Sequence, residues 1–252
     1  MQRYFVQLSF KGTNYHGWQI QPNAVTVQET VERAFSAVLR EKIEVVGAGR
    51  TDTGVHASFF IFHFDSQNSG LETDRLVYRL NGFLPADIAL KRIWKVPAGA
   101  HARFSALSRT YKYYIHRKKD PFKTETSCLF TGSLDIEKMK EGADLLPMYS
   151  DFTSFSRLHS DVKTHLCRII MADWDQDGNT LVFTIEADRF LRNMVRAITG
   201  TLIQLGTGKL TPEEFRSIIN ARDRRLAGDS APARGLFLTD IKYPANLICC
   251  NG

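Results

Sequence analysis

One short glycine-rich stretch holds residue types that could do chemistry. The stretch GAGRTDTGVHA (47–57) places Arg50 and Asp52 two residues apart among three glycines. Glycine lets the backbone adopt positive φ and approach another molecule closely, so we expect a shaped loop here. An arginine close to a carboxylate lowers the carboxylate pKa by about 1 to 3 pH units, which suits a nucleophile better than a general acid. An Arg–Asp pair in a loop is also a common structural ion pair, and the residues alone leave both interpretations open.

A strand rich in tyrosine and an arginine on a helix are further candidates. In TYKYYIHRKK (110–119), the alternation of a strand places Tyr111 and Tyr113 on one face. Such a ring either packs in the core or offers a plane on which an unstacked nucleobase can lie. Helical periodicity over 190–206 places Arg196 away from the main apolar stripe. Its guanidinium either extends into solvent or turns toward a carboxylate or phosphate, and periodicity does not choose.

The elements that must position these residues follow from hydrophobic patterning. The first part of the chain predicts a β-α-β-β-α-β order, with strands at 4–10, 42–46, 58–64 and 88–96 and helices at 26–39 and 74–80. The order then roughly repeats, with helices at 134–146, 190–205 and 212–221 and strands from Thr110 and at 165–174, 180–187 and 236–243. We therefore expect an α+β fold of two ferredoxin-like (RRM-like) halves with antiparallel sheets. The halves are 1–104, which carries the Asp52 loop, and 105–252.

Composition narrows the class of partner and cofactor. The chain has 33 Lys and Arg against 27 Asp and Glu, a net charge of +6, which favours a polyanionic partner without requiring one. Basic residues gather at 117–119 and 222–225 and around Arg103 and Arg109, and the aromatic residues Tyr15, Trp18 and Phe104 lie in or near loops. The cysteines form no CxxC pair and the histidines no HExxH motif, so we expect no metal. GTG at 206–208 lacks the rest of a phosphate-loop pattern, so we expect no nucleotide cofactor. The absence of a leader and of a long apolar stretch predicts a cytoplasmic protein that does not enter a membrane.

Several motifs occur together in a fixed order along the chain. They are GTNYHGWQIQP, GAGRTDTGVHA, LNGFLP followed by HARFSALSRTYKYYI, then DFTSF, FLRNMVRAITG and APARGLFLTDIKYP. Together they resemble the TruA-type tRNA pseudouridine synthases from end to end. The resemblance implies conversion of uridine to pseudouridine at positions 38, 39 and 40, in the anticodon stem-loop of tRNA, without a metal or other cofactor. It also implies a homodimer with a basic active-site cleft between the two halves of the chain.

The resemblance assigns roles to four residues by motif match. It implies that Asp52 is the nucleophile, that the ring of Tyr111 packs on the target uracil, and that Arg196 holds Asp52 charged. Arg50 would help to place the flipped nucleotide or its phosphate. Whether Asp52 attacks the sugar or the base is left open by the residues.

The sequence departs from the family motifs at two places, and two other functions are compatible with the same residues. Thr53 stands where the family commonly has alanine, and residues 156–165 match only loosely, so no role is assigned to His159 or Lys163. An RNA-binding module of the same fold would clamp tRNA without changing it. An N-glycoside hydrolase using the same carboxylate would release free uracil.

Overall fold

The computed structural model describes residues 1–157 and 163–248, and these form two compact units. The first unit contains Met1–Ser108 together with the chain from Leu238 onward, and the second contains Arg109–Phe237. The sequence-based halves divide the chain after residue 104, whereas here the C-terminal segment packs with the first unit. The Tyr243 hydroxyl donates to the Ala102 carbonyl and Leu107 N donates to Lys242 O at 2.7 Å. The division into two functional domains, 1–104 and 105–252, stays a prediction.

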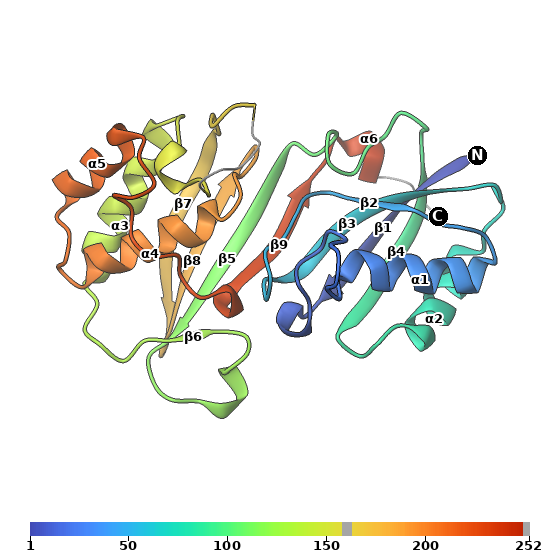
Figure 1. Ribbon diagram of the computed structural model, residues 1–252, viewed down its shortest axis with the longest axis horizontal. Helices are drawn as coiled ribbons and strands as arrows, with labels where there is room; N and C mark the ends of the chain where they lie inside the picture. The colour runs from blue at the N-terminus through green and yellow to red at the C-terminus, as the bar shows by residue number, and fades with distance from the viewer. Residues whose placement is uncertain (158–162, 249–252) are drawn as a thin grey trace. The chain divides into compact units, whose positions relative to one another are not determined.

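The first unit has the β-α-β-β-α-β order that the patterning predicts (Figure 1). Its elements are β1 (Gln2–Phe10), α1 (Val27–Leu39), β2 (Val45–Gly47), β3 (His56–Ser66), α2 (Thr73–Phe83) and β4 (Ile88–Val96), followed at the C-terminus by α6 (Ala245–Ile248). The strands are ordered β4-β1-β3, with antiparallel neighbours, and β2 pairs with β3. Strand β2 is shorter than predicted and begins at Val45, whose N–H donates to the Glu32 carboxylate at 2.9 Å.

The two faces of the first sheet are covered by different parts of the chain. On one face, the ring of Phe35 in α1 packs edge-on against Phe64 of β3, with centroids 5.0 Å apart. On the other face, Phe5 packs edge-on against Trp94, with centroids 5.9 Å apart. The indole N–H of Trp94 donates to Leu247 O at 2.8 Å, which holds the C-terminal helix α6 to this face.

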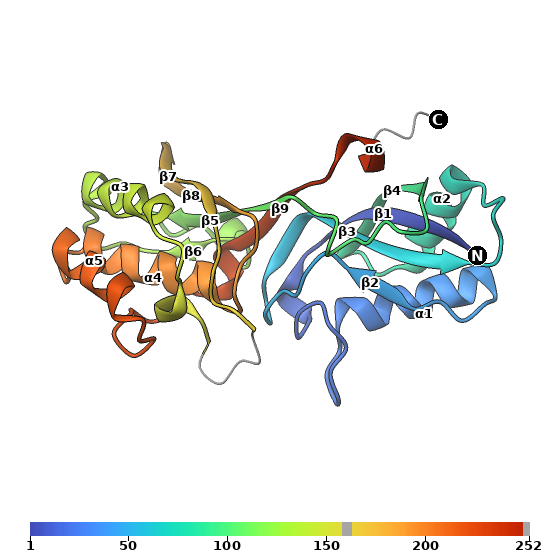
Figure 2. The same cartoon turned by 90° about the horizontal axis from the view of Figure 1, so that it is seen from above.

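The second unit combines antiparallel strands with the helices that pack against them (Figures 1 and 2). Its elements are β5 (Ser108–His116), β6 (Cys128–Leu129), α3 (Ile136–Leu145), β7 (Ile169–Asp177), β8 (Thr180–Ala187), α4 (Met194–Gly206) and α5 (Pro212–Ala221), and β9 (Leu236–Lys242) spans the division between the units. The strands are ordered β5-β8-β7 and run antiparallel, while β6 pairs with β5 in parallel. The predicted α+β class with mostly antiparallel strands is confirmed.

The predicted start of α5 agrees with the structure, whereas the predicted start of α4 does not. Helix α5 begins at the predicted residue 212, and Thr211 and Glu214 form a capping box there, with backbone-to-side-chain bonds of 2.8 and 3.2 Å. Helix α4, predicted from residue 190, begins instead at Met194. Asn193 precedes it with a left-handed backbone (φ 66°), and its side-chain amide donates to Ser230 Oγ at 2.6 Å. None of the helices in the described ranges is both long and apolar enough to cross a membrane.

Candidate active site

The Asp52 loop, residues 48–55, connects β2 to β3 in the first unit. Ala48 N donates to Ile61 O at 2.8 Å at its start, and Val55 N donates to Asp52 O at 3.1 Å at its end. Gly54 has φ 76°, so the loop has a glycine in the left-handed conformation that the sequence led us to expect. Asp52 is half-buried at the turn of this loop.

The neighbours of Asp52 in the chain differ in their surroundings. Arg50 is exposed, whereas Thr51 is only 9% exposed. The Thr51 hydroxyl has no hydrogen-bond partner among the described residues. A buried hydroxyl that makes no hydrogen bond carries a free-energy cost. The Thr51 hydroxyl, one residue from Asp52, is therefore available to donate or accept a hydrogen bond.

The segment 12–18 packs directly against the Asp52 loop. Gly54 N donates to Tyr15 O at 3.2 Å. A Cβ on Gly17, whose φ is 88°, would lie 2.2 Å from Thr51 O. No side chain fits at that distance, so glycine is required for this close approach. The motif GTNYHGW therefore sets the position of the backbone that carries Asp52.

Segment 12–18 is in turn held by Asp87, just before β4. The Tyr15 hydroxyl donates to Asp87 Oδ1 at 2.7 Å and the Asn14 side chain to Oδ2 at 3.1 Å. Burial raises the pKa of Tyr15, and its hydrogen bond to Asp87 adds to the effect. Gly12 N donates to Nδ1 of the buried His56 at 2.9 Å. Sequence reasoning missed Asp87, because no local signal connects it to segment 12–18. It also assigned no role to His56, although this residue lies in the motif GAGRTDTGVHA.

Two of the loop aromatics are structural and not surface residues. Tyr15 and Trp18 are 5% and 2% exposed, and the Trp18 ring stacks near Phe60 with centroids 4.2 Å apart. Both rings therefore belong to the core, although the two residues lie in or near loop segments. Phe104, by contrast, is 76% exposed.

Tyr111 lies on β5 in the second unit, opposite Ile185 of β8. It is half-buried, and its ring meets that of Phe190 edge-on, with centroids 5.2 Å apart. Tyr113 and Ile115, which share its strand face, are completely buried. The tyrosine face is therefore core along most of the strand and becomes accessible at Tyr111.

Arg196 lies in the first turn of α4 and is fixed by the segment that follows α5. Its Nε donates to Ala231 O at 2.7 Å, and Ala231 N donates back to Arg196 O at 2.9 Å. Arg196 is half-buried, and Thr199 on the same helix face is completely buried. The side chain is therefore held at Nε by packed backbone.

The segment around Ala231 is itself seated on α4 by close backbone contacts. Gly228 N donates to Thr201 Oγ1 at 3.0 Å. A Cβ on Gly200 would lie 1.8 Å from Asp229 O, so only glycine fits at this point of the helix. The motifs FLRNMVRAITG and APARG thus form one packed structure that sets the direction of Arg196.

The four candidate residues are divided between the two units. Asp52 and Arg50 belong to the first unit, and Tyr111 and Arg196 belong to the second. Each is placed by backbone contacts within its own unit, and the meeting of Asp52 with Arg196 stays a prediction. His159 lies outside the described residues, so no structural role follows for it.

The predicted basic clusters are partly neutralised. In the cluster 222–225, Arg222 contacts Asp151 at 3.1 Å and Arg225 contacts Asp223 at 2.6 Å. Hydrogen bonds from Arg225 lower the pKa of Asp223 to about 2, so this carboxylate stays ionised well into the acidic range. Among residues 1–157 and 163–248, no three His, Cys, Asp or Glu side chains come together as a metal site would require.

Comparison with known proteins gives a consistent result over almost the whole chain. A family model described as tRNA pseudouridine synthase matches residues 8–105 and 149–244. The tRNA pseudouridine synthase A of Bacteroides fragilis is 52% identical over 248 residues, which cover 98% of each chain. The protein of the same name from Bacillus subtilis is 39% identical over 240 residues, covering 94% of this chain and 97% of the relative. The chain belongs to the tRNA pseudouridine synthase family.

Proposed function

We propose that this protein converts uridine to pseudouridine at positions 38, 39 and 40 of the tRNA anticodon arm, with Asp52 as the nucleophile. Family membership supports the coarser statement, an isomerase that forms pseudouridine in tRNA. The observation that supports Asp52 as the nucleophile is the geometry of the Asp52 loop. A carboxylate stands half-buried on a backbone fixed by Gly17 and Gly54, next to an exposed arginine and a buried hydroxyl.

The reaction takes place on a uracil base that has left the RNA helix. The target uridine must leave its stack before any side chain can reach it. The bond from N1 to the sugar C1′ then breaks, the ring turns, and a bond from C5 to the same C1′ forms. The proton on C5 is lost and N1 gains one, so the change is a pure isomerisation. It needs no oxidant or cofactor, and the carboxylate of Asp52 is regenerated at the end.

The other candidates support this carboxylate. Arg196 supplies a positive charge that keeps it ionised, and the bond from Arg196 Nε to Ala231 O sets the direction of the guanidinium fork. Tyr111 offers the accessible part of its ring to the extruded uracil, steadied by Phe190. Arg50, exposed beside the nucleophile, holds a phosphate of the flipped nucleotide.

Water must be kept from the detached uracil, because its escape would leave an abasic site. The basic active-site cleft that the family resemblance implies would provide such an enclosure. We propose that the protein acts on the anticodon stem-loop as a cytoplasmic homodimer and uses no cofactor.

The test is to incubate the purified protein with unmodified tRNA transcripts and to map every pseudouridine formed. The proposal predicts modification at positions 38, 39 and 40 and at no other uridine. Modification elsewhere would contradict the assignment of the site. Binding without modification would favour an RNA-binding module, and release of free uracil would favour an N-glycoside hydrolase.

A further inference from the structure

The turn at residues 101–105 in the first unit displays two side chains at its tip. Phe104 is 76% exposed, and Arg103 is exposed beside it. The guanidinium carbon of Arg103 lies 5.4 Å from the Phe104 ring centroid. The His101 ring lies 4.4 Å from the same centroid, so Phe104 is supported at the base and open at the tip.

The turn is closed by its own hydrogen bonds. Ser105 N donates to His101 O at 2.9 Å, and His101 N donates to Ser105 Oγ at 3.0 Å. The backbone amides of Arg103 and Phe104 both donate to His101 Nδ1, at 3.1 and 3.3 Å. The backbone beneath the exposed ring is therefore fixed in one conformation.

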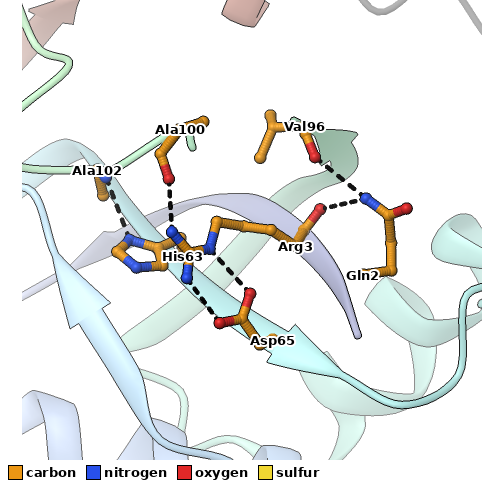
Figure 3. Close-up of polar contacts among 7 residues, drawn as sticks. All are labelled: Gln2, Arg3, His63, Asp65, Val96, Ala100 and Ala102. Carbon is orange, nitrogen blue, oxygen red and sulfur yellow. Dashed lines mark hydrogen bonds and ion pairs between the residues drawn. The ribbon is translucent and has the colours of Figure 1, made fainter. Parts of the chain in front are cut away.

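Side chains from the sheet anchor this turn (Figure 3). The buried His63 of β3 accepts from Ala102 N at 3.1 Å. Arg3 of β1 donates from Nη1 to Ala100 O at 2.9 Å, and its other two nitrogens form a bidentate pair with Asp65 at 2.8 and 2.7 Å. A cross-strand charge pair and a neutral histidine thus hold a turn whose tip faces solvent.

A single exposed phenylalanine is ordinary on a protein surface. This one differs because an anchored backbone presents it and a cation lies against its ring. A rigid aromatic plane beside an arginine is the arrangement that binds an unpaired nucleobase by stacking and its phosphate by charge. The net charge of +6 is of the sign that such a ligand requires.

We propose that Phe104 and Arg103 form a stacking platform for an unpaired nucleobase of the RNA substrate, separate from the base that is isomerised. This inference rests on the proposed function, in which the substrate is tRNA. Phe104 stacks on the base, and Arg103 neutralises a neighbouring phosphate. The platform positions the RNA and takes no part in bond breaking.

The experiment measures tRNA affinity as a function of salt, together with pseudouridine formation, for Phe104→Ala, Phe104→Trp, Phe104→Leu and Arg103→Ala. Phe104→Ala is expected to raise Kd about 5- to 150-fold, as loss of one base–aromatic stack does, and to leave the salt dependence unchanged. Phe104→Trp retains affinity, because it keeps a flat ring, whereas Phe104→Leu does not. Arg103→Ala reduces the slope of log K against log salt by about 0.7 to 0.9.

The control is Tyr78→Ala, which removes a ring that is 81% exposed on α2 of the same unit. It should bind tRNA as the wild type does. Wild-type affinity in Phe104→Ala, or full affinity in Phe104→Leu, would overturn the platform. Loss of self-association in Phe104→Ala at unchanged tRNA affinity would also overturn it and assign the ring to a second copy of the chain. An inactive wild-type protein would instead refute the proposed function.

Discussion

The backbone of Gly17 lies directly against the carbonyl oxygen of Thr51, the residue between Arg50 and Asp52. A Cβ on Gly17 would come within 2.2 Å of that oxygen, and its φ of 88° belongs to the region that favours glycine. Two motifs that are far apart in the sequence therefore share one task. GTNYHGW, which contains Gly17, fixes the backbone of GAGRTDTGVHA, which carries the Asp52 carboxylate.

We predict that Gly17→Ala lowers kcat/KM about 10- to 100-fold, because the added methyl group must push Thr51 and with it Asp52 out of place. The strained φ should also lower the free energy of unfolding by about 1 to 3 kcal/mol. Single-turnover pseudouridine formation and urea unfolding measure the two effects. The matched control is Gly49→Ala in the same loop, where a Cβ meets nothing within 4 Å. Equal activity in both variants would show that the contact does not position Asp52.

His63 should make the stability of the protein depend on pH. Burial, and then the charges of Arg3 and His101, lower its pKa from 6.5 to about 4. The unfolded chain therefore binds a proton that the folded protein does not between pH 6.5 and pH 4. The contribution of neutral His63 to the free energy of unfolding has its full value above pH 6.5. It falls as the pH drops from 6.5 to 4, and the loss between pH 7.5 and pH 5 is about 2 kcal/mol.

The measurement is urea unfolding at pH 7.5 and pH 5 for the wild type and His63→Asn. The asparagine keeps an acceptor near Ala102 N but cannot titrate. Other groups contribute equally to both proteins, so the difference between their pH dependences isolates His63. Identical pH dependences would refute a neutral, buried His63.

Tyr111 should act through its ring. Tyr111→Phe keeps the ring and its edge-on contact with Phe190, so we predict no more than a severalfold loss of kcat/KM. Tyr111→Ala removes the stacking plane and should lose about 5- to 150-fold. Thermal unfolding must show that the alanine variant is folded at the assay temperature, since the ring is half-buried. Comparable losses in the two variants would point to the hydroxyl.

Arg196 should support the chemical step more than the binding of tRNA. In the proposed role, Arg196→Ala removes the positive charge that keeps Asp52 ionised, and we predict a fall in kcat that far exceeds any rise in tRNA Kd. Arg196→Lys keeps the charge but loses the planar guanidinium that is fixed by the bond from Nε to Ala231 O. Its kcat should therefore lie between that of the wild type and that of Arg196→Ala. A defect in affinity alone would contradict the assigned role.

Local signals in the sequence predicted much of this fold. The capping box at Thr211 and Glu214 marks the start of α5 correctly, because both partners lie within one helical turn. Strand alternation put Tyr111 and Tyr113 on one face but could not show that the core ends between them. Asp87, which holds Tyr15 from 72 residues away, left no local signal. The start of α4 was misplaced for the same reason, since the bond from Asn193 to Ser230 joins distant segments.

The candidate site could be assigned from the sequence only through its motifs. The glycines around Asp52 indicated a shaped loop, but the partners that shape it come from segment 12–18 and from Asp87. Arg196 illustrates the same limit. Periodicity placed it off the apolar stripe, and only the contact with Ala231 shows why its side chain has a fixed direction.

The most direct test of the central claim is pseudouridine formation in an anticodon stem-loop substrate by Asp52→Asn. The substitution preserves shape and removes the charge, so the variant should bind tRNA within severalfold of the wild type and form no detectable pseudouridine. Wild-type rates of pseudouridine formation in Asp52→Asn would contradict the account.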